Sequence, residues 1–161
     1  MFILLIDIKR NTKVYGFCKI DIFEVKDEIV IITGSAGQLG RQYTLALLRA
    51  GARVVGLDIE EGEYTSELLK EFTDSFIFYN ADITSEASLK KALKFIRKRF
   101  GQPTVLINNA AIDSPPNSSS DENGPFELYP RQSWDKVLEV NITGTYLPCQ
   151  IFGSAMAENG N

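Results

Sequence analysis

Three glycines, Gly34, Gly37 and Gly40, are the residues whose type and spacing are best suited to binding a charged ligand. They stand three apart, directly after the apolar, β-branched run 29–32, and an amphipathic helix pattern follows them at once. This order predicts a buried strand that turns tightly into the N-terminus of a helix, where backbone N–H groups have no partner and carry partial positive charge. We predict that the turn binds a diphosphate: Gly34 allows the turn, Gly37 the approach of the phosphates and Gly40 the packing of helix on strand.

The acid Asp58 ends a second predicted strand, 53–58. It lies about 20 residues after the glycines, the spacing at which a carboxylate meets an adenosine ribose. Such a carboxylate accepts hydrogen bonds from the ribose hydroxyls and repels a 2′-phosphate, and Ile59 rather than an arginine follows it. The pattern therefore favours NAD(H) over NADP(H). The alternative role for Asp58 is that of an ordinary solvated loop acid.

Two further polar segments follow predicted strands. Asp82 comes after the third strand, and Asn108–Ala111 ends the fourth. The carboxyl ends of parallel strands meet at one edge of a sheet, where ligands bind. Asp82 is therefore placed either to meet an adenine ring or to cap the helix that begins near residue 84, and both roles stay open. The alanines would leave room for a ribose.

The composition excludes several classes of site and partner. The chain has 161 residues and no histidine, so catalytic triads and metal sites that need imidazole are excluded. Its two cysteines lack metal-type spacing, and we expect no metal site and a reducing compartment. The net charge is −4, and the basic residues of 90–99 form one helix face, so we expect no nucleic-acid partner. No apolar run is long enough for a membrane span, and no secretory signal is evident, so the protein reads as cytoplasmic.

Strand and helix patterns alternate from about residue 28. The predicted strands cover 28–33, 53–58, 76–80 and 104–108. The predicted helices cover 38–50, 64–72 and 85–100, followed by a long final helix from about residue 133 that Pro148 should kink or split. We predict an α/β fold with a doubly wound parallel sheet in the order third, second, first, fourth strand. The domain would cover 27–161, with 1–26 as an N-terminal extension of unknown structure.

The fourth strand should pair with a fifth that this chain lacks, which would leave an apolar sheet edge exposed. A long polar loop, 113–125, follows that strand.

The order and spacing of these motifs over roughly residues 22–161 resemble the short-chain dehydrogenase/reductase family. The resemblance implies a Rossmann-type fold, here truncated after about four strands and a long final helix. It implies hydride transfer between nicotinamide and a secondary alcohol or ketone as small-molecule substrate, and a dimer or tetramer formed through the last helix. The cofactor contacts it implies are Gly34, Ser35, Gly37, Gln38, Leu39, Gly40, Asp58, Ile59, Asp82, Ile83, Asn109, Ala110 and Ala111.

Asn141 matches the helix asparagine that supports a water-linked proton relay in that family, which would make it a catalytic residue. Its alternative role is to bond its own helix backbone near Gly144, as asparagines in helices often do.

The chain departs from the family pattern in two ways. The spacing of Gly34, Gly37 and Gly40 is typical of the extended, sugar-nucleotide-modifying branch, whereas 106–111 is typical of the single-domain branch, so the subfamily stays open. The family's serine and its tyrosine four residues before a lysine are also missing; Tyr15 and Lys19 have the spacing but precede the first strand. We therefore expect this chain to bind NAD(H) without turnover. It would be a fragment of a dehydrogenase/reductase, whose substrate the glycine spacing makes sugar-related, or of a sugar-nucleotide epimerase, dehydratase or reductase of the extended branch. The alternative is a short non-catalytic NAD-binding module, and the ending of the chain where the next strand is due favours the fragment.

Overall fold

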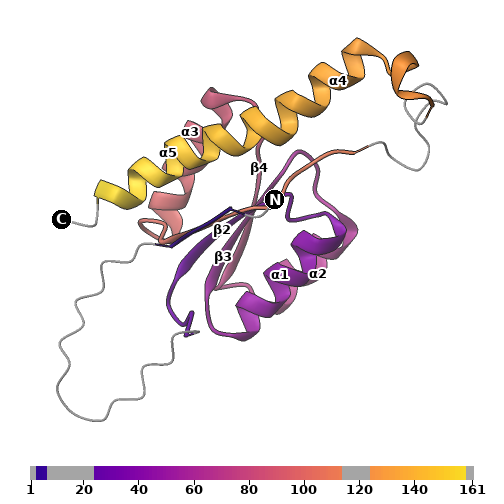
Figure 1. Ribbon diagram of the computed structural model, residues 1–161. Coiled ribbons are helices and arrows are strands. Elements are labelled where there is room, and N and C mark those ends of the chain that lie inside the picture. Colours follow the sequence, from indigo (N-terminus) through magenta and orange to yellow (C-terminus); the bar gives the residue numbers. More distant parts are fainter. Residues whose placement is uncertain (1–2, 7–23, 114–123, 159–161) are drawn as a thin grey trace, which may run out of the picture.

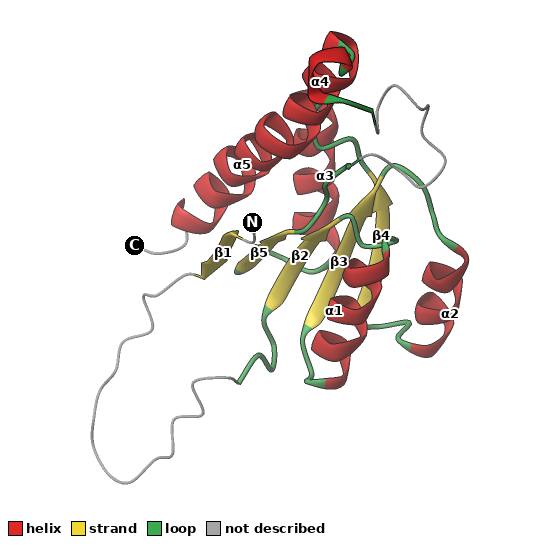
Figure 2. Cartoon of the chain, turned by 45° about the vertical axis from the view of Figure 1, so that its right-hand side comes forward, coloured by secondary structure: helices red, strands yellow, loops and turns green. Residues whose placement is uncertain are grey.

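The computed structural model describes residues 3–6, 24–113 and 124–158, which form a sheet between two layers of helices (Figures 1 and 2). Its five strands lie in the order β1-β5-β2-β3-β4. The strands are β1 (Ile3–Ile6), β2 (Ile29–Thr33), β3 (Arg53–Asp58), β4 (Phe76–Asn80) and β5 (Val105–Asn108). The helices are α1 (Gln38–Arg49), α2 (Glu63–Glu71), α3 (Glu86–Arg99), α4 (Arg131–Leu138) and α5 (Gly144–Glu158).

Each face of the sheet has its own core, because side chains alternate along each strand. On one face Val30, Ile32 and Val54 pack with residues of α1 and α2, including Leu48 and Leu68. On the other face Ile31, Val55, Leu57 and Leu106 pack with residues of α3 and α5, including Ile96 and Phe152. Burial on both faces explains why the central strands are continuous runs of Val and Ile rather than alternating patterns.

The four predicted strands and their order are confirmed. Strand β2 pairs in parallel with both β3 and β5, and β4 pairs in parallel with β3. Because all four strands run the same way, their carboxyl ends lie together. The turns after Thr33, Asp58, Asn80 and Asn108 therefore lie at the same end of the sheet, and the candidate site lies there.

The expectation of an exposed edge at β5 is wrong. Strand β1 pairs antiparallel with β5, with Ile3 opposite Asn108 and Ile6 opposite Val105. The backbone of β1 thereby supplies hydrogen-bonding groups to an edge that would otherwise be open. The sequence does not reveal this pairing, because no turn motif joins the two strands and about 100 residues separate them. The candidate pair Tyr15 and Lys19 lies outside the described residues, as does most of the predicted loop 113–125.

The final helical rod is continuous through Pro148, so the expectation of a split there is wrong. Its irregularity lies one turn earlier, where the π-helical turn η3 (Glu139–Thr143) joins α4 to α5. Pro148 lacks the N–H that would bond the carbonyl of Gly144, and Gly144 is the first residue after the π turn. The hydrogen-bonding pattern already changes at this point, so the proline adds little disruption. A short 3-10 turn, η2 (Phe126–Leu128), precedes α4.

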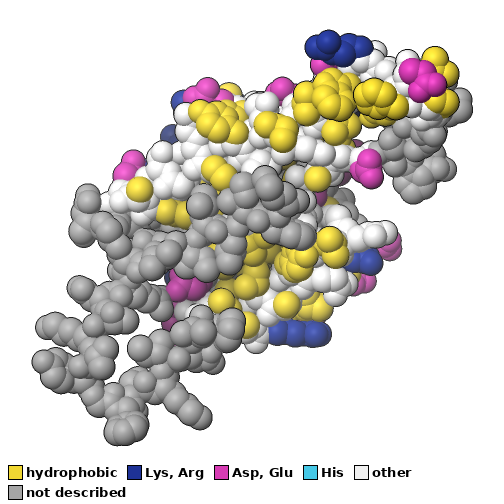
Figure 3. Space-filling model, viewed as in Figure 1, with side chains coloured by type: hydrophobic (Ala, Val, Ile, Leu, Met, Phe, Trp, Pro, Cys, Tyr) yellow, Lys and Arg dark blue, Asp and Glu magenta, His cyan; other side chains and the backbone are white. Residues whose placement is uncertain are grey.

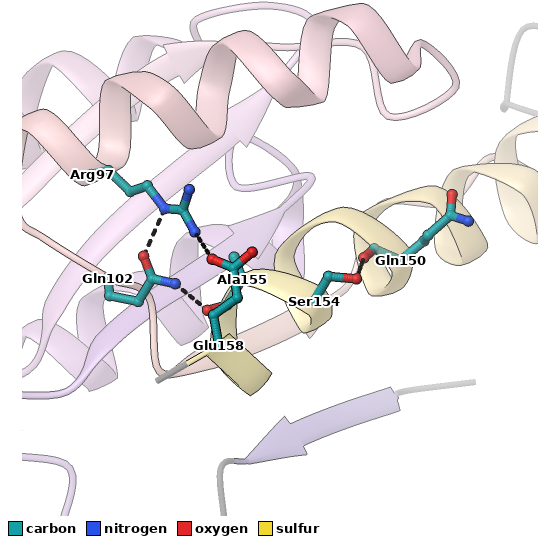
Figure 4. Close-up of polar contacts among 6 residues, drawn as sticks. All are labelled: Arg97, Gln102, Gln150, Ser154, Ala155 and Glu158. Atoms are coloured by element: carbon teal, nitrogen blue, oxygen red, sulfur yellow. Dashed lines mark hydrogen bonds and ion pairs between the residues drawn. The ribbon is translucent and has the colours of Figure 1, made fainter. Parts of the chain in front are cut away.

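A polar cluster fastens the end of α5 to α3 and to the loop before β5 (Figure 4). Arg97 donates to the Gln102 side chain at 2.6 Å and forms an ion pair with Glu158 at 2.6 Å. The Gln102 amide in turn donates to the carbonyl of Ala155. These contacts orient the final helix across the sheet. None of the helices in the described ranges is long and apolar enough to cross a membrane.

Deletion of residues 1–23 tests the role of β1 as an edge strand. We expect the β5 amides that face β1 to exchange faster with solvent, and the shortened chain to associate more at a given concentration, because an open strand edge pairs with other chains. Hydrogen exchange and light scattering measure the two effects. The amides of β4, at the opposite edge, serve as the control. Unchanged β5 exchange together with unchanged association would show that β1 does not cover this edge.

Candidate cofactor site

The strand-to-helix turn that the glycines predict is present between β2 and α1. Gly34 has φ +67°, and a Cβ there would lie 2.7 Å from Cα of Ala110, so both its conformation and its surroundings require glycine. A Cβ on Gly40 would lie 2.0 Å from the carbonyl oxygen of Gly34. The close packing of helix on strand therefore depends on Gly40. The turn also brings the end of β2 against the segment that follows β5.

The first turn of α1 presents backbone N–H groups without a side-chain cap. The N-cap residue is Gly37, in an extended conformation. As a glycine it has no side chain that could accept a hydrogen bond from these amides. The first intrahelical bond is that from Arg41 N–H to the Gly37 carbonyl, at 3.1 Å. The preceding amides, including those of the exposed residues Gln38 and Leu39, have no intrahelical partner. The arrangement can accept an anionic group.

Asp58 lies directly against the glycine turn. Its Oδ2 accepts a hydrogen bond from the Ala36 N–H at 2.9 Å, and its Oδ1 accepts one from the Ile59 N–H at 2.8 Å. A carboxylate has about four acceptor positions, so two bonds leave capacity for ribose hydroxyls. Asp58 is the half-buried last residue of β3 and bonds the glycine turn. The side chain of the adjacent Ile59 is 65% exposed.

Asp82 and Ile83 follow β4 at the same edge. Oδ1 of Asp82 accepts hydrogen bonds from both the amide and the hydroxyl of Thr84, at 2.8 and 2.7 Å, while Ser85 is the N-cap of α3. Asp82 is exposed and orders the turn before the helix. Ile83 is buried with its side chain against Gly144, where an added Cβ would lie 2.5 Å from its Cδ1. In this arrangement a ligand would contact Ile83 through its main chain.

Asn109 joins the ends of β2 and β5. Its Nδ2 donates to the carbonyls of Thr33 and Gly34, both at 3.0 Å. The Thr33 hydroxyl accepts from the amides of Asn109 and Ala110, at 3.0 and 3.1 Å. Thr33 is thus a further positioning residue, and its place just before Gly34 was the signal for it. Ala111, next along the chain, is exposed beside this junction.

Asn141 lies in the π turn, but its side chain does not bond its own helix. Its Oδ1 accepts from the Ile112 N–H and its Nδ2 donates to the Ile112 carbonyl, both at 2.9 Å. Its main-chain carbonyl accepts from the Thr145 hydroxyl at 2.9 Å. The amide side chain therefore fastens the segment after β5 to the final helix.

Ser35 is the buried residue of the turn 34–37. Its hydroxyl lies against Gly56 on β3 rather than at the mouth of the turn, and the residue is 5% exposed. Gly56 and Gly62, which contact Ser35 and Ala36, were missed by sequence reasoning, since each stands alone in its segment. The described ranges contain no group of three His, Cys, Asp or Glu residues that could hold a metal ion.

Substitution Asn141→Ala tests the junction between the final helix and β5. It leaves the N–H and carbonyl of Ile112 without their partners, so we expect a loss of about 1–3 kcal/mol of unfolding free energy and faster exchange of the Ile112 amide. Urea unfolding and hydrogen exchange measure these. Gln150→Ala is the matched control, since the Gln150 amide donates only to the exposed Tyr146 hydroxyl. Equal stabilities of the two variants would contradict this role of Asn141.

Comparison with known proteins agrees with this geometry. The family model described as short chain dehydrogenase matches residues 28–161. A short chain dehydrogenase/reductase of Macrophomina phaseolina is 34% identical over 120 residues, which cover 73% of this chain and 65% of the relative. The D-threitol dehydrogenase of Mycolicibacterium smegmatis is 27% identical over 140 residues, covering 86% and 51%.

Among solved structures, a short chain dehydrogenase from Leptospira borgpetersenii with bound NAD+ is 29% identical, with a TM-score of 0.70. The match covers 84% of this chain and 48% of that one. The chain thus spans about half the length of several proteins it matches. With the family model matching most of its residues, the chain belongs to the short-chain dehydrogenase family.

Proposed function

We propose that residues 27–161 form the NAD(H)-binding domain of an oxidoreductase that moves hydride between nicotinamide and a secondary alcohol or ketone. The observation that carries the proposal is the hydrogen bond from Ala36 N–H to Asp58, because an acid that would bind a ribose then lies against a turn that would bind a diphosphate. NAD supplies the hydride acceptor when bound, and this chain's own residues bind and orient it.

The cofactor would contact the described residues at four points. The amides at the start of α1 would hold the diphosphate, because the N-cap residue is Gly37 and no side chain caps them. Asp58 would accept hydrogen bonds from the adenosine ribose, and its charge disfavours a 2′-phosphate there. Asp82 would contact the adenine, and the 109–111 segment would lie along the nicotinamide ribose.

We propose that the 161-residue chain binds the cofactor without turning over a substrate. Tyr15 is the only tyrosine with a lysine four residues later, and it precedes the cofactor-binding domain. Asn141 would take part indirectly, by holding the main chain of Ile112 beside the π turn. A polyol or a related sugar alcohol is the substrate class we propose for the whole enzyme, on the similarity to a D-threitol dehydrogenase.

Substitution Asp58→Ala tests the cofactor assignment. Hydrogen bonds to a charged group contribute about 1.5–3 kcal/mol each, so we expect NADH to bind about tenfold to a hundredfold more weakly. The preference for NADH over NADPH should shrink, because the charge that disfavours the 2′-phosphate is gone. Fluorescence titration of both dinucleotides measures this.

The matched control is Asp74→Ala, which removes one negative charge at an exposed position between α2 and β4. It should bind NADH as the unmodified chain does. Equal NADH affinities for Asp58→Ala and the unmodified chain would sink the assignment of Asp58. Turnover of NAD+ with a polyol by the 161-residue chain would overturn the proposal that it is inactive alone.

We further propose that the final helical rod pairs with a second copy of the chain. A row of apolar side chains runs along it at steps of four, and the rod carries yellow patches in Figure 3. The exposed fractions are 47% for Trp134, 39% for Leu138, 61% for Ile142 and 57% for Tyr146. Steps of four drift by about 40° around an α-helix, and the wider π turn takes up part of that drift. The row therefore stays on one side, as a pairing helix requires.

Substitution Ile142→Lys places a charge in the middle of this row. We expect it to shift the chain from dimer toward monomer in sedimentation velocity, since an unpaired charge in an apolar interface is costly. Lys136→Ala, on the same rod but not in the row, should leave association unchanged. A single oligomeric state shared by all three proteins would rule out this face as the contact.

A further inference from the structure

The hydroxyl of Ser35 is buried without a hydrogen-bond partner, which is unusual for a polar group. Ser35 is 5% exposed, and its Oγ is one of two buried side-chain oxygens in the described part of the chain that lack a partner. The residue stands inside the glycine turn, one position before the amide that bonds Asp58. Hydrogen bonding therefore does not explain why a serine stands at this position.

The reason lies in the space that Ser35 occupies. A Cβ added to Gly56 in β3 would lie 2.6 Å from Oγ and 2.9 Å from Cβ of Ser35, and 3.2 Å from a ring carbon of Phe76. The Ser35 side chain therefore fills the gap that the missing side chain of Gly56 leaves on the sheet. Glycine weakens the interior of a strand, and its presence often marks a close approach of another segment.

The turn also packs closely against α1 and against the start of α2. A Cβ on Gly40 of α1 would lie 2.8 Å from Cα of Ser35, so Ser35 sits between α1 and β3 with little room to move. The Cβ of the next residue, Ala36, lies 3.3 Å from the position a Cβ would take on Gly62, the N-cap of α2. The side chains of Ser35 and Ala36 thus contact Gly56 in β3 and Gly62 at the start of α2.

We propose that Ser35 and Gly56 are a volume-matched pair of positioning residues for the dinucleotide. Their contact sets the height of the turn above β3, and with it the position of the Ala36 N–H relative to Asp58 and of the first amides of α1. The proposal rests on the cofactor assignment made above. It adds that dinucleotide affinity depends on the contact between Ser35 and Gly56, which the dinucleotide itself would not touch. The Ser35 hydroxyl contributes volume rather than a hydrogen bond.

The experiment compares ADP binding, by calorimetry, in the 161-residue chain and its variants, because the turn and Asp58 would contact only the ADP half of the cofactor. Gly56→Ala pushes Ser35 away from the sheet, so we expect ADP to bind at least about tenfold more weakly. Adding Ser35→Gly to Gly56→Ala makes room for the new methyl group and should restore most of the affinity.

Val55→Ala is the matched control, since Val55 is the neighbouring β3 residue and faces the opposite core. It should lower the midpoint of urea unfolding but leave the ADP affinity unchanged. A general loss of stability would affect Val55→Ala and Gly56→Ala alike, whereas a displaced turn affects only the second.

Exchange of the Ala36 amide provides a readout that needs no ligand. It should accelerate in Gly56→Ala and slow again in the double variant, because this N–H donates to Asp58 only when the turn lies close to β3.

Normal ADP binding by folded Gly56→Ala, or a double variant no better than Gly56→Ala in both readouts, would overturn the pairing. If Gly56→Ala does not fold, restoration of folding by Ser35→Gly supports the pair, and its failure refutes it. If the unmodified chain binds neither ADP nor NADH, the cofactor assignment fails, and the Ala36 exchange still decides the pairing.

Discussion

The hydrogen bond from the Ala36 N–H to the Asp58 carboxylate is the interaction on which the candidate site depends. It joins the turn after β2 to the end of β3, and so fixes an anion-accepting helix start beside an acid. The bond forms only because the chain can pass very close to the sheet at this point. Gly34, Gly40 and Gly56 provide that closeness, since a Cβ on any of them would lie within 3.0 Å of a neighbouring atom.

A second set of contacts joins the β2 turn to β5 and then to the final helix. The Asn109 side chain bonds the carbonyls of Thr33 and Gly34, and Asn141 bonds the main chain of Ile112. Both asparagines satisfy backbone groups where strands end and no ladder continues. They explain how residues 109–112, directly after β5, keep a defined position at this end of the sheet. In this structure the Asn141 side chain positions the main chain of Ile112.

Most of the fold could be predicted from local patterns. The four parallel strands, their order and the helices between them follow from continuous Val and Ile runs, from amphipathic spacing and from the glycine turn. The site was also largely predictable by position, because parallel strands bring their carboxyl ends to one edge. Prediction failed where a contact was non-local, as in the pairing of β1 with β5. Local patterns also say nothing of the burial of Ile83 under Gly144 or of the inward Ser35 hydroxyl, because each depends on a packing partner far along the chain.

The sequence by itself determined the type and order of the elements, and with them the edge at which Gly34, Asp58, Asp82 and Asn109 gather. Local preferences and burial patterns suffice for this, because they depend on neighbours along the chain. Only the tertiary structure decided which side chains of these segments are exposed and which are buried against neighbouring elements. Asn141 reaches Ile112, and Ser35 rests on Gly56, because elements far apart in sequence approach at distances of a few ångströms. Such contacts depend on the packed volumes of several segments at once, and no single segment encodes them.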